Sequence, residues 1–113
     1  MPKLREVVVS ENALRDMEEI YLYIAQESGA VVALQILDAL EKRCDSLSEL
    51  SDRGNRPKEL LAAGVMKYRE LHYKPYRLIY EVGNQTVIVH AVLDGRRDMK
   101  VLLAQRLPKA GKD

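Results

Sequence analysis

Three arginines near the end of the chain are the side chains best suited to chemistry. Arg77 opens the apolar run YRLIYEV, and Arg96 and Arg97 follow the apolar run VIVHAVL within DGRRD. A guanidinium is permanently charged and presents several N–H donors in one plane, so it can hold a phosphate or a carboxylate through two hydrogen bonds. We therefore expect these arginines to bind an anionic partner.

The same arginines also have a structural explanation. Arg77 can form an ion pair with Glu81 or across to a neighbouring strand on a solvent-exposed face of the sheet. Arg96 and Arg97 lie between two aspartates in DGRRD, which can neutralise either of them within the turn. Adjacent residues point in different directions, so we expect one of this pair to share a site with Arg77.

The other candidates for catalysis are two histidines and one cysteine. His90 is flanked by apolar residues in VIVHAVL, and His72 lies in an alternating segment near Lys74. A general base needs a substrate proton within reach, and neither context indicates one. Cys44 falls on an apolar stripe and is expected to be a buried hydrophobic residue. These residues form no metal-ligand pattern, and phosphate-binding and dinucleotide fingerprints are absent, so no metal or cofactor is expected.

The elements that position these residues follow from hydrophobic periodicity. Ser10 is a predicted helix N-cap, Gly29 a predicted helix stop, and Gly83-Asn84 a predicted hairpin turn. A helical turn is also expected in ELLAAG, closing at Gly64. The main predicted elements are a strand at 3–9, helices at about 11–28 and 30–47, strands at 66–73, 76–82 and 86–93, and a helix at about 99–107.

This order, β-α-α-β-β-β-α, predicts an α+β fold. Short connections join the three late strands, so they should form an antiparallel meander, with the first strand at its edge. The two amphipathic helices form a hairpin that must bury its apolar faces, and we expect it to cover one face of the sheet. A length of 113 residues corresponds to a single domain over residues 1–113.

Composition and charge narrow the class of protein. The chain is 47% hydrophobic and 31% charged, which is typical of a globular protein. It contains one cysteine and no apolar run of membrane-spanning length, so we expect a cytoplasmic protein without membrane association. The net charge is −5 over residues 1–50 and +6 over residues 51–113. This asymmetry indicates a basic face for nucleic acid or an acidic peptide, or simply acidic helices balanced by a basic sheet.

The segments YRLIYEV at 76–82 and VIVHAVLDGRRD at 87–98, preceded by a helical hairpin, resemble the RelE/ParE superfamily. These proteins are the toxins of type II toxin–antitoxin modules, which act in plasmid stabilisation. The resemblance spans nearly the whole chain. It implies a cognate antitoxin as partner, forming a hetero-oligomer with the toxin. It also implies that Arg69, Arg77, Arg96 and Arg97 bind the target.

The superfamily contains two activities, and the sequence favours one of them. RelE-like members are mRNA endonucleases that cut mRNA on the ribosome with basic residues and often a late Tyr or His, whereas ParE-like members inhibit DNA gyrase. Arg77 and Arg97 match nuclease positions, but Leu103 stands where a catalytic tyrosine is expected. The net charge of +1 is also weak for a ribosome-directed nuclease. We therefore expect a ParE-like gyrase inhibitor rather than an enzyme. The alternative is a nuclease that uses Arg77, Arg97 and His72.

The antitoxin is expected to fold a disordered segment across the toxin surface. Met17, Tyr21 and Ile24 on the first helix are candidates for this contact, and they are equally candidates for the core. A toxin that has kept antitoxin binding but lost toxicity is a third reading of the sequence.

Overall fold

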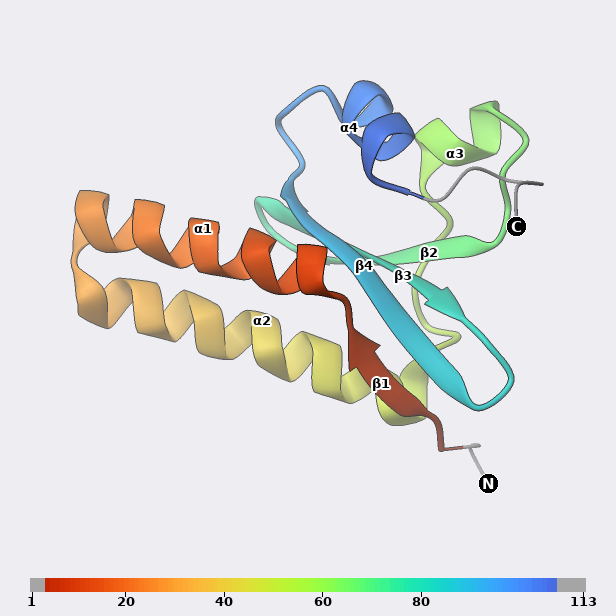
Figure 1. Cartoon of the computed structure of the whole chain (residues 1–113), viewed down its shortest axis with the longest axis horizontal. Coiled ribbons are helices and arrows are strands. Elements are labelled where there is room, and N and C mark those ends of the chain that lie inside the picture. The colour runs from red at the N-terminus through yellow and green to blue at the C-terminus, as the bar shows by residue number, and fades with distance from the viewer. Residues whose placement is uncertain (1–3, 108–113) are drawn as a thin grey trace.

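A four-stranded sheet lies between two groups of helices in the computed structural model, which describes residues 4–107 (Figure 1). The sheet order is β1-β4-β3-β2, with β1 parallel to β4 and the other neighbours antiparallel. The predicted meander and the edge position of the first strand are therefore confirmed. The strands are β1 (Glu6–Val9), β2 (Tyr68–Tyr73), β3 (Tyr76–Val82) and β4 (Thr86–Asp94).

The helical hairpin consists of α1 (Glu11–Ser28) and α2 (Ala30–Leu50). The Ser10 side chain accepts a hydrogen bond from the Ala13 N–H at 3.1 Å, which satisfies one of the free N–H groups of the first turn. Gly29 separates the helices with a φ of 93°, a backbone conformation that residues other than glycine rarely adopt. The N-cap and the helix stop predicted from the sequence are both confirmed.

One face of the sheet packs against this hairpin. Along β3 the side chains alternate, so that Tyr76, Leu78 and Tyr80 face the hairpin. Burial of these apolar groups is the main force that holds the hairpin on the sheet. The buried residues of this first core are Ala13, Met17, Leu40, Cys44, Leu47, Leu71, Tyr76, Leu78, Tyr80, Val87, Val89 and Val92.

The opposite face is covered by α3 (Lys58–Ala62) and α4 (Met99–Arg106). Ile79 and Ala91 of the sheet contact Leu103 of α4 in a second, smaller core. The helical turn expected before Gly64 is α3, and Gly64 follows it with a φ of 78°. The sequence predicted the α4 helix but not the face of the sheet that it covers. In the structure, α4 closes this second core.

A β-bulge in β4 separates the two halves of that strand. Ile79 pairs with Ala91 and Tyr80 pairs with Val89, which leaves His90 without a partner in the register. Because of the extra residue, Val89 and Val92 both reach the hairpin core although they are three positions apart.

Candidate functional site

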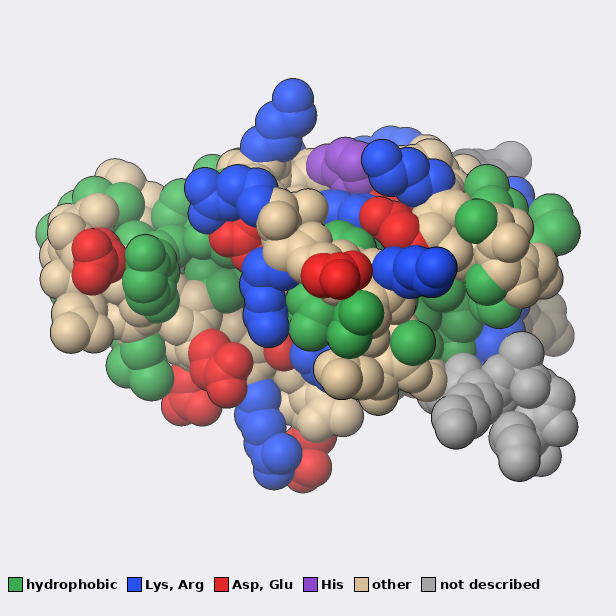
Figure 2. All heavy atoms as spheres, turned by 90° about the horizontal axis from the view of Figure 1, so that it is seen from above, with side chains coloured by type: hydrophobic (Ala, Val, Ile, Leu, Met, Phe, Trp, Pro, Cys, Tyr) green, Lys and Arg blue, Asp and Glu red, His purple; other side chains and the backbone are tan. Residues whose placement is uncertain are grey.

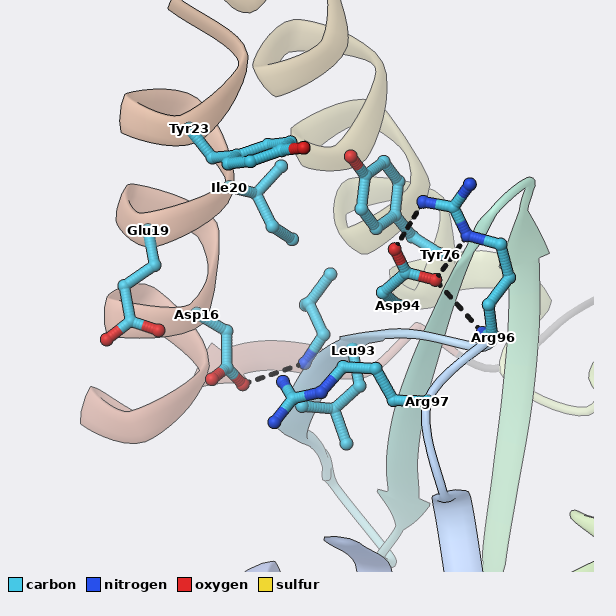
Figure 3. A pocket seen from close by; sticks show the side chains of 10 residues that line it. Asp16, Glu19, Ile20, Tyr23, Tyr76, Leu93, Asp94, Arg96 and Arg97 are labelled. Atoms are coloured by element: carbon cyan, nitrogen blue, oxygen red, sulfur yellow. Dashed lines mark hydrogen bonds and ion pairs between the residues drawn. The ribbon is translucent and has the colours of Figure 1, made fainter. Parts of the chain in front are cut away.

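A groove lies between α1 and the turn that follows β4 (Figure 3). Its volume is about 300 Å³. Ile20, Tyr23 and Tyr76 supply apolar surface, while Glu19 and Arg97 supply opposite charges at its walls. The full lining is Asp16, Glu19, Ile20, Tyr23, Tyr76, Val92, Leu93, Asp94, Arg96 and Arg97.

Arg96 is neutralised within its own turn. Its backbone N–H and its Nε each donate to Asp94 Oδ1 at 2.9 Å, and Nη2 donates to Oδ2 at 2.6 Å. The Arg96 hydrogen bonds lower the pKa of Asp94. The structural alternative recognised in the sequence therefore describes Arg96. The side chain is 75% exposed, so a partner can still reach this ion pair.

Arg97 differs from its neighbour. Its backbone N–H donates to the Asp94 carbonyl at 3.1 Å, but within residues 4–107 its guanidinium has no ion pair. Figure 3 shows this side chain extending along the groove toward α1. Arg97 is thus the arginine of the pair that presents an unneutralised charge to a partner.

Asp16 lines the groove and forms an ion pair with Arg106, and neither residue was a predicted site residue. Arg106 Nη1 and Nη2 donate to the two Asp16 oxygens at 2.8 Å each. Asp16 Oδ2 also accepts from the Val92 N–H at 2.9 Å. This buried cluster ties α1 to β4 and α4, across 90 residues of sequence. No local sequence pattern reveals a pair so far apart.

Arg77 is held on the opposite face of the sheet by two carboxylates. Its Nη1 and Nη2 donate to Glu59 at 2.9 and 2.7 Å, and its Nε donates to Glu70 at 2.6 Å. The Arg77 side chain is 12% exposed. The hydrogen bonds that Arg77 donates lower the pKa of Glu59 to about 2, and the same bonds raise the pKa of Arg77.

This arrangement answers the question that the sequence left open for Arg77. The ion pair with Glu81 is wrong, since Glu81 contacts His90 and Lys67. The cross-strand alternative is confirmed, because Glu70 lies on the neighbouring strand β2, and Glu59 of α3 is a second partner. All three nitrogens of the guanidinium are occupied. Three of its five N–H donors are therefore in use, and two carboxylates neutralise its charge, which makes Arg77 a weaker phosphate ligand than an unpaired arginine.

Two further predicted site residues lie along the edge strand β2. Arg69 Nη1 donates to the Gly54 carbonyl at 2.8 Å and so holds the loop that follows α2. His72 is about half exposed, and its Nε2 lies 3.3 Å from Glu70 Oε2. Seen from the side of α3 and α4, Lys and Arg side chains spread across the middle of the face beside a histidine (Figure 2).

The candidates for antitoxin binding are mostly inward-facing. Met17 is 5% exposed in the hairpin core, and Ile24 packs partly against it. Tyr21 is half-buried. The apolar side chains that the hairpin leaves in solvent are different ones, among them Leu22 and Val31 at 59% and 71% exposure. Helical spacing alone does not separate these two sets, because both faces of the hairpin carry apolar residues.

The remaining candidates have structural roles. His90 Nε2 lies 2.9 Å from Glu81 Oε1, and its ring contacts Tyr68 edge-on. Leu103 is 1% exposed in the second core and is directed away from any site. Cys44 is buried as predicted, and burial raises its pKa to about 12. Within residues 4–107 no three metal-binding side chains come together, and no helix has the length and apolarity needed to cross a membrane.

Two solved structures from toxin–antitoxin systems contain a chain with a similar fold. A chain in the structure of the chromosomal ParDE toxin–antitoxin system from Pseudomonas aeruginosa is similar to this one, with a TM-score of 0.68 and 18% identity. The match covers 79% of this chain and 94% of that one. The RelBE2 toxin–antitoxin complex of Mycobacterium tuberculosis matches with a TM-score of 0.60 and 20% identity, over 81% of this chain and 92% of that one. At these identities the likeness shows a shared fold.

The family follows from the sequence comparison. The family model described as the ParE toxin of the type II toxin–antitoxin system parDE matches residues 7–99. A comparison with curated protein sequences gives no significant match. Because the family model covers most of the chain, this protein belongs to the ParE toxin family of type II toxin–antitoxin systems. The superfamily and the fold class predicted from the sequence are confirmed.

Proposed function

We propose that this toxin inhibits DNA gyrase and that a cognate antitoxin neutralises it in a hetero-oligomeric complex. The observation that carries the proposal is the double ion pair of Arg77 with Glu59 and Glu70. In a nuclease this arginine would have to stabilise the charge on a phosphate in the transition state. A guanidinium that is already paired with the buried Glu70 and the half-buried Glu59 is a poor candidate for that task.

Leu103 supports the same conclusion. Its side chain is buried against Ile79 and Ala91, so the position expected for a catalytic tyrosine contributes to the core instead. His72 is the remaining candidate base for a RelE-like mRNA endonuclease, and its Nε2 lies 3.3 Å from the Glu70 carboxylate, which also accepts a hydrogen bond from Arg77. With catalysis disfavoured, the toxin is proposed to act by binding its target in the cytoplasm.

The groove beside α1 is the proposed surface for gyrase. Tyr and Arg side chains are enriched among the residues that dominate protein interfaces, and this groove presents Tyr23, Tyr76 and Arg97 together. Arg96 adds an exposed ion pair at its rim. Of the three candidates for antitoxin binding, Tyr21 and Ile24 are partly exposed and keep that proposed role, together with their exposed neighbours. Met17 is buried in the core.

A gyrase supercoiling assay tests this proposal. Purified toxin should block supercoiling of relaxed plasmid, and adding the antitoxin should restore it. Arg97→Ala should weaken inhibition at least about tenfold, because arginine truncation at an interface centre commonly costs more than about 1 kcal/mol. Arg15→Ala, which removes an exposed arginine elsewhere on α1, is the matched control. Full gyrase activity at saturating toxin would refute the proposal.

A further inference from the structure

A second hollow, distinct from the gyrase groove, lies between α2 and the free edge of β2. Its volume is about 350 Å³. Three permanent cations line it, and no carboxylate does. The lining residues are Lys42, Arg43 and Ser46 of α2, Arg53 of the following loop, and Leu71 and His72 of β2.

The two arginines of this hollow are held in place by neutral groups. Arg53 Nη2 donates to Ser46 Oγ at 2.9 Å, and Ser46 Oγ in turn donates to the Arg43 carbonyl at 2.7 Å. The Arg43 guanidinium lies 5.1 Å from the centre of the Tyr73 ring. Stacking on an aromatic face orients a guanidinium but leaves its edge N–H groups free for a ligand. Neither arginine has an ion pair with a carboxylate within residues 4–107.

The third cation is also available. Lys42 Nζ lies 3.0 Å from Asp38 Oδ2, but the two side chains are 74% and 61% exposed. Exposed pairs of this spacing contribute only about 0.3–0.5 kcal/mol, so a ligand can displace Asp38 at little cost. Arg77 and Arg106 differ from these cations, because each forms an ion pair with a carboxylate of low exposure. The positive charge of this hollow is therefore available to a ligand.

The positive surface continues beyond this hollow. His72 also lines two adjacent hollows on the same edge of the sheet, each of which contains further cations. Those cations are Lys74 in one, and Arg56 and Lys58 in the other. Arg77 lines both and Arg96 lines the first, but each is paired with a carboxylate, and Glu70 itself lines the second. A ligand that follows the edge therefore meets repeated positive charge, which suits a polyanion better than a single phosphate.

We propose that this edge binds the phosphate backbone of duplex DNA. A protein partner would need apolar anchors, and Leu71 is the one apolar side chain among the six that line the hollow between α2 and β2. The choice of DNA rests on the proposed function, since gyrase holds duplex DNA during its reaction. The toxin would then contact gyrase through the Arg97 groove and the DNA through Lys42, Arg43 and Arg53.

Salt-dependent binding of the full-length toxin to a fluorescent DNA duplex tests this inference without gyrase. Neutralising three phosphates should give a slope of about −3 when the logarithm of the binding constant is plotted against the logarithm of salt concentration. The double variant Arg43→Gln/Arg53→Gln should reduce that slope by about 2 and weaken binding at least about tenfold at low salt. Arg15→Gln/Lys100→Gln removes the same charge from exposed positions on α1 and α4, and should leave the slope unchanged.

Folding and ligand identity are controlled separately. The variant Arg43→Lys/Arg53→Lys keeps both charges and should recover most of the binding, while far-ultraviolet circular dichroism checks that each variant is folded. An equal loss of binding in the control double variant would overturn the inference, because it would show that net charge alone matters. An RNA duplex that binds ten times more tightly than DNA would overturn the choice of DNA. Either failure would leave the gyrase assay of the wild-type toxin unaffected.

Discussion

Replacing Glu59 by Gln is expected to remove a pH-dependent part of the stability of this protein. Glu59 is 16% exposed and accepts two hydrogen bonds from Arg77. The hydrogen bonds from Arg77 lower the pKa of Glu59 from 4.5 to about 2 in the folded state. Between pH 4.5 and about 2, Glu59 is therefore mostly protonated in the unfolded chain and mostly ionised in the folded chain, so acid favours unfolding.

The size of this effect follows from the two pKa values. A difference of about 2.5 pKa units corresponds to roughly 3 kcal/mol of stabilisation, which is fully present above pH 4.5 and lost as the pH falls toward 2. At pH 3 about 2 kcal/mol of it is already gone. In Glu59→Gln this contribution is absent at every pH, since the amide does not titrate.

Urea denaturation of wild type and Glu59→Gln at pH 7 and pH 3 measures the effect. The difference between their unfolding free energies should shrink by about 2 kcal/mol between the two conditions. Glu49→Gln, at an exposed glutamate of α2, should give the same small difference at both values of pH. A difference for Glu59→Gln that does not change with pH would show that the bond to Arg77 does not perturb Glu59, and the structural role assigned to Arg77 would be refuted.

Two further variants and one labelling experiment test other contacts. Asp16→Asn should cost about 3 kcal/mol by urea denaturation, since it leaves Arg106 without its buried counter-charge, and a cost below about 1 kcal/mol would contradict that role. Gly54→Ala should lower the melting temperature, because the added methyl group would clash with Tyr80 Oη and with backbone of β2, and an unchanged value would contradict the close approach. Cys44 should resist thiol reagents at pH 8 in the native protein and react on unfolding, and rapid native labelling would contradict its burial.

The sequence predicted the fold because its signals are local. Ser10 and Gly29 mark the ends of α1 through hydrogen bonding and backbone conformation within a few residues. The apolar residues of YRLIYEV and VIVHAVL mark strands of the sheet in the same local way. Signals of this kind are readable without knowing which elements meet in space.

The site was less predictable because its contacts join distant residues. Glu59 lies on a five-residue helix that carries no strong pattern, yet it determines what Arg77 can do. The Asp16–Arg106 pair depends on how α4 closes over the sheet, which the sequence analysis left open. The hollow that contains Arg43 and Arg53 forms only where α2 and the edge of β2 come together. The charge asymmetry of the chain does not reveal it, because Lys42 and Arg43 lie in the acidic half of the sequence.

The most direct test of the account compares two activities in one toxin preparation. With gyrase, plasmid and ATP, the toxin should trap the cleavage complex, so that adding detergent and protease releases linear DNA in proportion to the toxin present. In a translation extract the same preparation should leave mRNA intact. Codon-phased cuts in the mRNA, with no linear DNA released from an active gyrase, would contradict the conclusion that this toxin acts by binding rather than by catalysis.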